Sequence, residues 1–354
     1  MIFTGDIALP LCGLIKIKQL DKALSEKQWI GNLEGSLLDE DSILSNNPLS
    51  KRKVFNSLEA VSELCHTLNF KAFNIANNHL LDACNCKETI QNLRQLDIPF
   101  LGGGTNLNEA QKPLLMTDEG NDYVILSFGW NAIRCRYANE NKEGVNPYTR
   151  KNVMDQVSKV LSNYPNRRII LFFHWNYELE VIPQPMDREF AHKLIDMGVY
   201  AVIGCHAHRV QPIEIYKGQP IVYGLGNFAF PSKVYMDGTL GFPDFSEDEI
   251  AFEIKGDGTF AVHKFNYNRQ SLTLCYLAEE EITPAIFEGM SDNSYKKYFK
   301  KNKFKGKGLP IFYYSDSDFI YKMKVNWVKL RDHLIFFLIK NKNIIHKLKN
   351  SIFK

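Results

Sequence analysis

Histidine, asparagine and carboxylate side chains occur along this chain in combinations that suit the binding of a metal ion. The sharpest combination is Gly204-Cys205-His206-Ala207-His208, in which two histidines are two residues apart. Neutral imidazole is a common ligand for zinc, manganese and iron, so the pair can direct two rings at one ion or at two adjacent ions. Taken alone, the pair is explained equally well as two histidines in a loop.

A second combination is Asn77-Asn78-His79, with Asp82 three residues later. The neutral carbonyl of an asparagine suits a site that already holds several carboxylates and histidines. An adjacent histidine can protonate a leaving oxygen or stabilise charge on a phosphoryl group. Taken alone, an asparagine turn after a strand, with His79 exposed, is the simpler explanation.

His174 ends an apolar run, where a buried imidazole needs a ligand or a hydrogen-bond partner. Four residues later, Glu178 could orient a ligand or contact substrate, or could simply be a surface glutamate. Asp6 and Glu34 also follow apolar runs, and clustered carboxylates repel one another unless a cation compensates. Together with the two combinations above, these residues predict one metal site, since their joint occurrence is hard to obtain by chance.

Short apolar runs that alternate with helical patterns must position these side chains. The expected strands are Met1–Thr4, Trp29–Ile30, Ala72–Ile75, Pro99–Leu101, Tyr123–Phe128, Arg168–Phe173 and Val199–Ile203. The expected helices are Ser57–Leu68, Cys86–Leu96, Lys151–Leu161 and Arg188–Met197. The alternation indicates parallel βαβ units, whose ligands bind beyond the carboxyl ends of the strands. After Gln211, Ile213–Tyr223 and Ile250–Phe265 read as antiparallel hairpins.

Composition limits the class of protein. The 354 residues are 45% hydrophobic, enough for one large domain with an appendage or for two domains. The net charge of +3 argues against a dedicated nucleic-acid binder. Seven cysteines form no visible disulfide framework, and the sequence has neither a signal-peptide pattern nor an apolar stretch long enough to span a bilayer. We therefore expect a cytoplasmic protein.

Residues 319–354 read as a basic amphipathic helical tail, preceded by a connecting segment, 271–318. Apolar residues recur there at steps of three and four, among them Met323, Trp327 and Leu330. Such a helix can lie on an anionic membrane, here the inner membrane surface. The same stripe could instead pack on the main domain or on a second subunit, with its lysines in solvent.

Several spaced motifs can be compared with known families. They are Gly5-Asp6, Asn32-Leu33-Glu34, Asn77-Asn78-His79 with Asp82, His174-Trp175 with Glu178, Gly204-x-His206-x-His208 with Gln211, and Tyr223-Gly224-Leu225-Gly226-Asn227-Phe228. Over about residues 1–270 they resemble the CapA family of bacterial capsule-synthesis or poly-γ-glutamate-synthesis proteins, which are similar to calcineurin-like metallophosphoesterases.

The resemblance implies a four-layer α/β fold, with two packed mixed sheets flanked by helices and a metal centre, usually dinuclear, at the sheet edge. It implies two divalent transition-metal ions, Mn, Fe or Zn, and makes His79 the residue beside the scissile phosphate. The implied metal ligands are Asp6, Glu34, Asn78, His174, His206 and His208. The implied substrate-binding or supporting residues are Asn32, Asn77, Asp82, Glu178, Gln211 and Asn227.

The chain also departs from the family pattern. Ala8 stands where the phosphoesterases generally have the histidine of an Asp-x-His motif, so one metal ion could lack a ligand. Family members often have His at Cys205, Pro at Ala207 and Gly at Asn176, and many carry an N-terminal membrane anchor. The resemblance therefore supports the expected fold more strongly than it supports catalysis.

Three functions follow as expectations. The first is metal-assisted hydrolysis of a phosphate ester or diester in capsule or surface-polysaccharide metabolism, on a phosphorylated or anionic saccharide or polymer. The second is cleavage or transfer of a γ-glutamyl amide polymer. The third is a non-catalytic accessory protein that binds an anionic polymer. Oligomeric state has no signature in the sequence.

Overall fold

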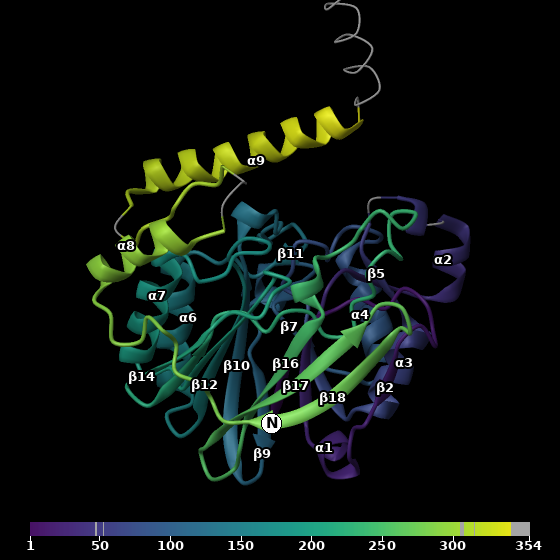
Figure 1. Ribbon diagram of the computed structural model, residues 1–354, viewed down its shortest axis with the longest axis horizontal. Helices are drawn as coiled ribbons and strands as arrows, with labels where there is room; N and C mark the ends of the chain where they lie inside the picture. The colour runs from purple at the N-terminus through teal and green to yellow at the C-terminus, as the bar shows by residue number, and fades with distance from the viewer. Residues whose placement is uncertain (47, 52, 305–307, 315, 341–354) are drawn as a thin grey trace, which may run out of the picture.

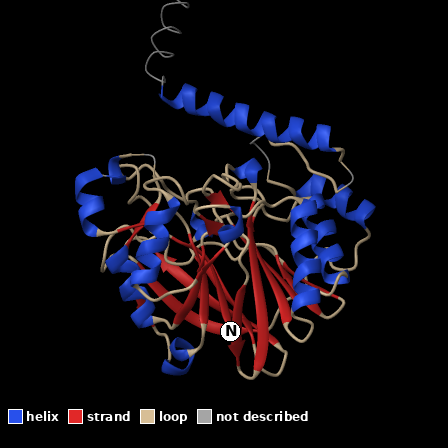
Figure 2. Ribbon diagram, turned by 180° about the vertical axis from the view of Figure 1, so that it is seen from behind, coloured by secondary structure: helices blue, strands red, loops and turns tan. Residues whose placement is uncertain are grey.

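The computed structural model describes residues 1–46, 48–51, 53–304, 308–314 and 316–340. Within them, two large mixed sheets pack face to face, and helices lie on both outer sides of the pair (Figure 2). This arrangement confirms the four-layer α/β sandwich that the sequence predicts, and a C-terminal helix follows it (Figure 1).

Across the described residues, the strands form two large and two small sheets. In spatial order, the eight-stranded sheet contains β2 (Lys16–Lys18), β18 (Thr273–Glu280), β17 (Phe260–Asn268), β16 (Asp248–Ile254), β1 (Ile2–Ile7), β3 (Trp29–Leu33), β6 (Phe70–Asn74) and β7 (Phe100–Leu101). The six-stranded sheet contains β14 (Ile213–Tyr216), β15 (Gln219–Val222), β13 (Ala201–Cys205), β12 (Arg168–His174), β10 (Asn121–Gly129) and β9 (Leu114–Asp118). The small pairs are β8 (Gly103–Gly104) with β11 (Gly144–Val145), and β4 (Ser36–Leu38) with β5 (Phe55–Ser57).

The helices lie between and after these strands. They are α1 (Lys22–Glu26), α2 (Glu40–Asn46), α3 (Leu58–Thr67), α4 (Cys86–Gln95), α5 (Leu107–Ala110), α6 (Arg150–Asn163), α7 (Pro185–Asp196), α8 (Asp292–Asn302) and α9 (Asp318–Lys340). The short 3₁₀ segments are η1 (Pro48–Ser50), η2 (Asn131–Ile133) and η3 (Asp244–Ser246).

Parallel strands form one half of the eight-stranded sheet, ending at its edge strand β7, and the middle of the six-stranded sheet. β1, β3, β6 and β7 pair in parallel, as do β10, β12, β13 and β15. The antiparallel strands β16 to β18 and the β14–β15 hairpin come from the later part of the chain. The two antiparallel hairpins expected after Gln211 are therefore confirmed, whereas β9, which pairs antiparallel with β10 earlier in the chain, is not among the expected strands.

Successive side chains along a strand pack alternately against the opposite sheet and against the covering helices. Phe3 points into the space between the sheets and meets Phe172 of the opposite sheet with ring centroids 5.8 Å apart. Its neighbour Ile2 belongs to the other apolar cluster, together with residues of the covering helices such as Val61 of α3. Because successive residues of a strand face opposite sides, both faces of each sheet are apolar.

The later part of the chain contributes more secondary structure to the fold than the sequence predicts. Segment 271–318, expected as a connection, contributes β18 to the eight-stranded sheet between β17 and β2, and also α8. The apolar period of β18 is weak, since only its first two residues are buried. The division of the chain into domains remains a prediction. The tail helix expected over residues 319–354 is present as α9 (Asp318–Lys340), and residues 341–354 lie outside the described residues.

Asp187, in the first turn of α7, is a buried carboxylate whose burial raises its pKa to about 7. Its Oδ1 accepts a hydrogen bond of 2.9 Å from the Tyr148 hydroxyl, whereas Oδ2 has no partner among the described residues. The folded state holds a proton that the unfolded state releases near pH 4, so stability falls as pH rises from about 4 to 7.

We therefore expect Asp187→Asn to unfold at a higher temperature than the wild type at pH 8, with the difference shrinking towards pH 4. Thermal unfolding followed by circular dichroism across this range measures the effect. A difference that is the same at pH 4 and pH 8 would show that the carboxyl does not titrate in this window.

Candidate metal centre

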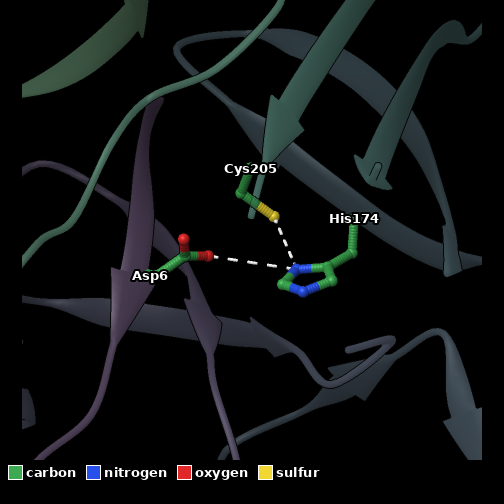
Figure 3. Close-up of side chains that lie close together, drawn as sticks. All are labelled: Asp6, His174 and Cys205. Carbon is green, nitrogen blue, oxygen red and sulfur yellow. Dashed lines mark hydrogen bonds and ion pairs between the residues drawn. The ribbon is translucent and has the colours of Figure 1, made fainter. Parts of the chain in front are cut away.

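Residues from both large sheets meet at one edge, where the parallel strands end. Asp6 lies near the end of β1, and Glu34 directly follows β3. In the other sheet, His174 is the last residue of β12 and Cys205 the last of β13. Figure 3 shows Asp6 facing His174 and Cys205 across the space between the two sheets. The carboxyl ends of the strands thus bring these side chains to one place, as the sequence predicts for Asp6, Glu34 and His174.

Asp6, His174 and Cys205 form the first group, with one potential ligand atom from each within 4.8 Å of the others. Nδ1 of His174 lies 3.9 Å from Asp6 Oδ1 and 3.2 Å from Cys205 Sγ. All three side chains are buried. The other ring nitrogen of His174, Nε2, lies 2.7 Å from Oδ1 of Asn78. Asn78 is thereby brought to the same group.

Glu34, His206 and His208 form the second group by the same distance criterion. His208 lies between the groups, with Nδ1 3.3 Å from Asp6 Oδ2 and Nε2 3.9 Å from Glu34 Oε1. The rings of His174 and His206 have centroids 4.7 Å apart. The two groups are therefore neighbours in one buried cluster, which we call the histidine–carboxylate cluster.

His79 lies at the rim of this cluster, with its side chain 25% exposed. Its Nδ1 is 2.6 Å from Asp82 Oδ2, and its Nε2 is 3.7 Å from Glu34 Oε1. An Nδ1–H that donates to Asp82 leaves Nε2 on the side of the cluster. Asp82 also accepts from the backbone N–H of Val54, which holds the carboxylate in position.

Two asparagines hold the ligand side chains in place. Asn32 donates from Nδ2 to Asp6 Oδ1 at 2.7 Å, and Oδ1 of Asn32 itself accepts from Asn74. Oδ1 of Asn227 lies 2.8 Å from Nδ1 of His208. Such hydrogen bonds fix the orientation of a ligand and the tautomer of a ring.

Three other residues singled out in the sequence lie further from the cluster. Asn77 bonds to backbone groups of three neighbours, among them Gly35 N–H and Leu33 C=O, and so fixes the loop that carries His79. Gln211 accepts from Asn176 and donates to a backbone carbonyl. Glu178 is exposed, and its charge contributes to the raised pKa of Glu34.

The backbone around the cluster shows one very close approach between two segments and two residues with unusual φ angles. A Cβ on Gly5 would lie 1.9 Å from the carbonyl oxygen of Gly226, so only glycine lets β1 approach the loop that carries Asn227. His206 and His208 have φ of 95° and 49°, in a region that non-glycine residues rarely adopt. Backbone strain of this kind concentrates at functional sites.

Burial controls the charges of the cluster. It raises the pKa of Glu34 well above the usual value, and the nearby charge of Asp6 raises it further. Burial also raises the pKa of Asp6 and, with the neighbouring His206 and His208, holds the pKa of His174 well below its usual value. His174 is therefore a neutral imidazole at pH 7, the form that binds metal ions.

These residues fit a divalent transition metal. Both oxygens of the buried Glu34 carboxylate have no hydrogen-bond partner among the described residues. A buried carboxylate without hydrogen bonds, beside a second carboxylate, is costly unless a cation is shared between them. Imidazole and carboxylate together suit Mn, Fe or Zn. The ligand set named from the sequence is thus brought together, while its role as ligands remains a prediction.

Cys205 is the residue of the cluster that the sequence does not single out. Its burial raises the pKa of the thiol well above the usual value, so it is protonated unless a metal displaces the proton. The period of two in β13 is a signal that could have identified it, because Cys205 faces the same side as Ile203, between the sheets.

Glu34→Gln tests whether Glu34 is a metal ligand, because we expect it to change stability in opposite directions without and with metal. Without metal, burial raises the pKa of the Glu34 carboxyl, whereas the unfolded chain ionises it freely at neutral pH. The amide has no such cost, so we expect a higher unfolding temperature than in the wild type at neutral pH. With added Mn²⁺, we expect the wild type to be stabilised and the variant to respond much less. Thermal unfolding with chelator and with Mn²⁺ measures both effects, and Glu281→Gln, at an exposed position, is the control. An equal response of Glu34→Gln and wild type to Mn²⁺ would remove Glu34 from the ligand set.

The chain belongs to the family of bacterial capsule synthesis proteins described as PGA_cap, whose model matches residues 17–232. The matched region contains every residue of the cluster except Asp6. This match confirms the family resemblance seen in the spaced motifs.

Several relatives have names that refer to capsule, PGA or polyglutamine synthesis. The chain is 28% identical over 167 residues to the PGA biosynthesis protein CapA of Bacillus subtilis, covering 46% of this chain and 43% of that protein. It is 26% identical over 204 residues to the capsule biosynthesis protein CapA of Bacillus anthracis, covering 56% and 49%. It is 29% identical over 213 residues to a probable polyglutamine synthesis accessory protein of Mycobacterium tuberculosis, covering 55% and 53%. The chain therefore matches about half the length of each of these relatives.

Two solved structures align with most of the chain at low scores. The 5′-nucleotidase precursor from Thermus thermophilus aligns with a TM-score of 0.39 and 11% identity, covering 79% of this chain and 50% of that one. The NAD nucleotidase NadN of Haemophilus influenzae aligns with a TM-score of 0.34 and 13% identity, covering 87% and 51%. With scores this low, the alignments say nothing about the activity of this chain.

Proposed function

We propose that this chain is a metal-dependent hydrolase of a phosphate ester or diester in capsule or surface-polysaccharide metabolism. The single observation that carries the proposal is the position of His79. It is a partly exposed imidazole held by Asp82 at the rim of the buried histidine–carboxylate cluster, 3.7 Å from Glu34. A proton donor beside a metal centre is what the departure of an alkoxide from phosphorus requires.

The residues that would hold metal are Asp6, His174, Glu34, His206 and His208, with the Asn78 carbonyl beside His174. A divalent ion bound there would polarise phosphoryl oxygens and neutralise developing charge. Asn32 and Asn227 keep Asp6 and His208 oriented, which fixes the position at which a phosphate group would be held.

His79 would act on the leaving group. With Nδ1 donating to Asp82, a protonated ring carries its second proton on Nε2, which faces the cluster. That proton can pass to the oxygen of the departing alcohol, and the Asp82 carboxylate stabilises the protonated ring before the transfer. The partial exposure of His79 allows the substrate to reach it from solvent.

A second candidate function is supported by the names of the relatives, two of which concern PGA or polyglutamine synthesis. The same cluster could act on the amide of a γ-glutamyl polymer, where a metal would polarise a carbonyl instead of a phosphoryl group. A third candidate is a non-catalytic accessory role, in which the centre binds an anionic polymer without turnover.

One screen separates the three candidates. Purified protein, supplemented with Mn²⁺, is incubated with phosphomonoesters, with phosphodiesters and with γ-linked polyglutamate. Phosphoester turnover that disappears in Glu34→Gln supports the proposal, and shortening of polyglutamate without phosphoester turnover supports the amide reaction. Binding of polymer without any turnover supports the accessory role, and both of the last two results overturn the proposal.

A further inference from the structure

Helix α9 has two apolar faces, and only one of them contacts the rest of the described chain. The contacting face includes Val325 and Val328, which are almost fully buried. It also includes Tyr321, whose hydroxyl accepts a hydrogen bond of 2.7 Å from Trp130 Nε1, and Asp332, which pairs with Arg134 at 3.3 Å. These residues recur at steps of three and four, so they form one side of the helix.

The other apolar face of α9 is exposed. We call it the outer face, and its side chains are between 45% and 72% exposed. Its members are Phe319, Ile320, Met323, Trp327, Leu330, Leu334 and Leu338. At roughly 100° per residue they lie within an arc of about 100°, on the side opposite Val325 and Val328. The stripe recognised in the sequence is therefore not the one that packs on the domain.

Basic side chains border the outer face on both sides. Lys322 and Lys329 lie along one border, and Lys324 and Arg331 along the other. Of these four, Lys324 pairs with Asp316, and Arg331 pairs with Asp332 on the contacting face, which also pairs with Arg134. The other acidic residue of α9 is Asp318, in its first turn, so basic residues still outnumber acidic ones there. Beyond α9, the sequence of residues 341–354 adds five lysines or histidines and no acidic residue. The charge next to the outer face is consequently positive.

We propose that the outer face of α9 binds an anionic lipid surface. A wide apolar stripe with a tryptophan and bordering lysines is the pattern of helices that lie in the plane of a membrane interface. The positive border complements anionic headgroups, whereas the same border on two copies of this helix would repel. No helix within the described ranges is long and apolar enough to cross a bilayer, so the contact would be peripheral.

The position of α9 determines which side of the protein would face the membrane. α9 lies at the end of the molecule opposite the N-terminus (Figure 1). It packs against η2, which directly follows β10, and the backbone N–H of Trp130 donates to the carbonyl of His174. α9 thus covers part of the sheet edge that carries the histidine–carboxylate cluster. A membrane on the outer face would lie on that side of the protein.

Trp327 provides a direct readout. The chain has four tryptophans, and Trp29, Trp130 and Trp175 are fully buried, whereas Trp327 is 53% exposed. We expect the full chain to sediment with vesicles of phosphatidylcholine and phosphatidylglycerol, with a blue shift of its tryptophan emission. Vesicles of phosphatidylcholine alone, or high salt, should bind it much less. Trp327→Phe should still sediment but lose the blue shift.

The decisive variants place charge on the outer face. Leu330→Glu with Leu334→Glu should weaken sedimentation by ~10-fold or more, since both side chains would have to leave the lipid interface. The matched control is Leu44→Glu with Ile286→Glu, two leucine or isoleucine side chains exposed elsewhere, which should bind as the wild type does. Circular dichroism checks that both double variants fold.

Three results would overturn the proposal. The first is an absence of both sedimentation and blue shift with anionic vesicles. The second is equal binding by the outer-face variant and its control. The third is a dimer of the wild type in the absence of lipid, seen by light scattering, that is lost in the outer-face variant although this variant still binds vesicles as the wild type does. That last result would assign the outer face to a second copy of the chain.

Discussion

His79→Ala is expected to keep its bound metal and to lose turnover by ~10²–10⁴-fold, the usual contribution of a positioned general acid. His79 lies at the rim of the cluster, and its Nδ1 is engaged by Asp82 at 2.6 Å. Removing it leaves Asp6, His174, Glu34, His206 and His208 in place. The loss should appear in kcat, and it should be smaller for a substrate whose leaving group needs no proton.

Turnover of an alkyl phosphate ester and of a nitrophenyl phosphate ester, with metal content measured in parallel, distinguishes the roles of His79. The matched control is His66→Ala, because His66 is exposed on α3 and bonds to a backbone carbonyl within its own helix. Loss of metal from His79→Ala would make His79 a ligand. Unchanged kcat for both substrates would exclude it from the reaction.

His206→Ala combined with His208→Ala is expected to remove most of the bound transition metal and to weaken its affinity by more than ~100-fold. The two rings belong to the group completed by Glu34, and His208 also lies 3.3 Å from Asp6. The fold should survive, because both residues lie in the loop after β13 and not within a helix or strand. The positive φ of both residues also suggests that the loop is held for binding rather than for stability.

Elemental analysis and far-ultraviolet circular dichroism of the double variant measure both parts of this expectation. His66→Ala with His333→Ala removes the same number of imidazoles from exposed helical positions and serves as the control. Full metal content in the His206 and His208 variant would show that the metal lies elsewhere. Loss of the native spectrum would show that the two rings are structural.

The strand ends were predictable because apolar runs, turn residues and polar termini are local features. Asp6, Glu34 and His174 each follow such a run, and the rule that ligands lie beyond carboxyl ends then assigns them to one edge. The sequence could not show that they come from two different sheets. That division depends on which strands pair, and pairing is set by contacts between distant segments.

Other features were hidden for related reasons. Helix α7 begins at Pro185, three residues before the expected Arg188, because proline is favoured in the first turn even though the apolar period starts later. Cys205 reads as an ordinary buried residue until His174 is found 3.2 Å from its sulfur. In α9, two interleaved apolar stripes share one helix, and only the tertiary contacts show that Val325 and Val328 face the domain.

The central claim is that the histidine–carboxylate cluster is a metal centre, and elemental analysis of the purified full-length chain tests it most directly. The protein is treated with chelator, reconstituted with Mn²⁺, Fe²⁺ or Zn²⁺ and separated from free ions before measurement. We expect at least one tightly held ion per chain, and two if both groups of the cluster bind. A wild-type chain that retains no ion under any of the three conditions would contradict the account.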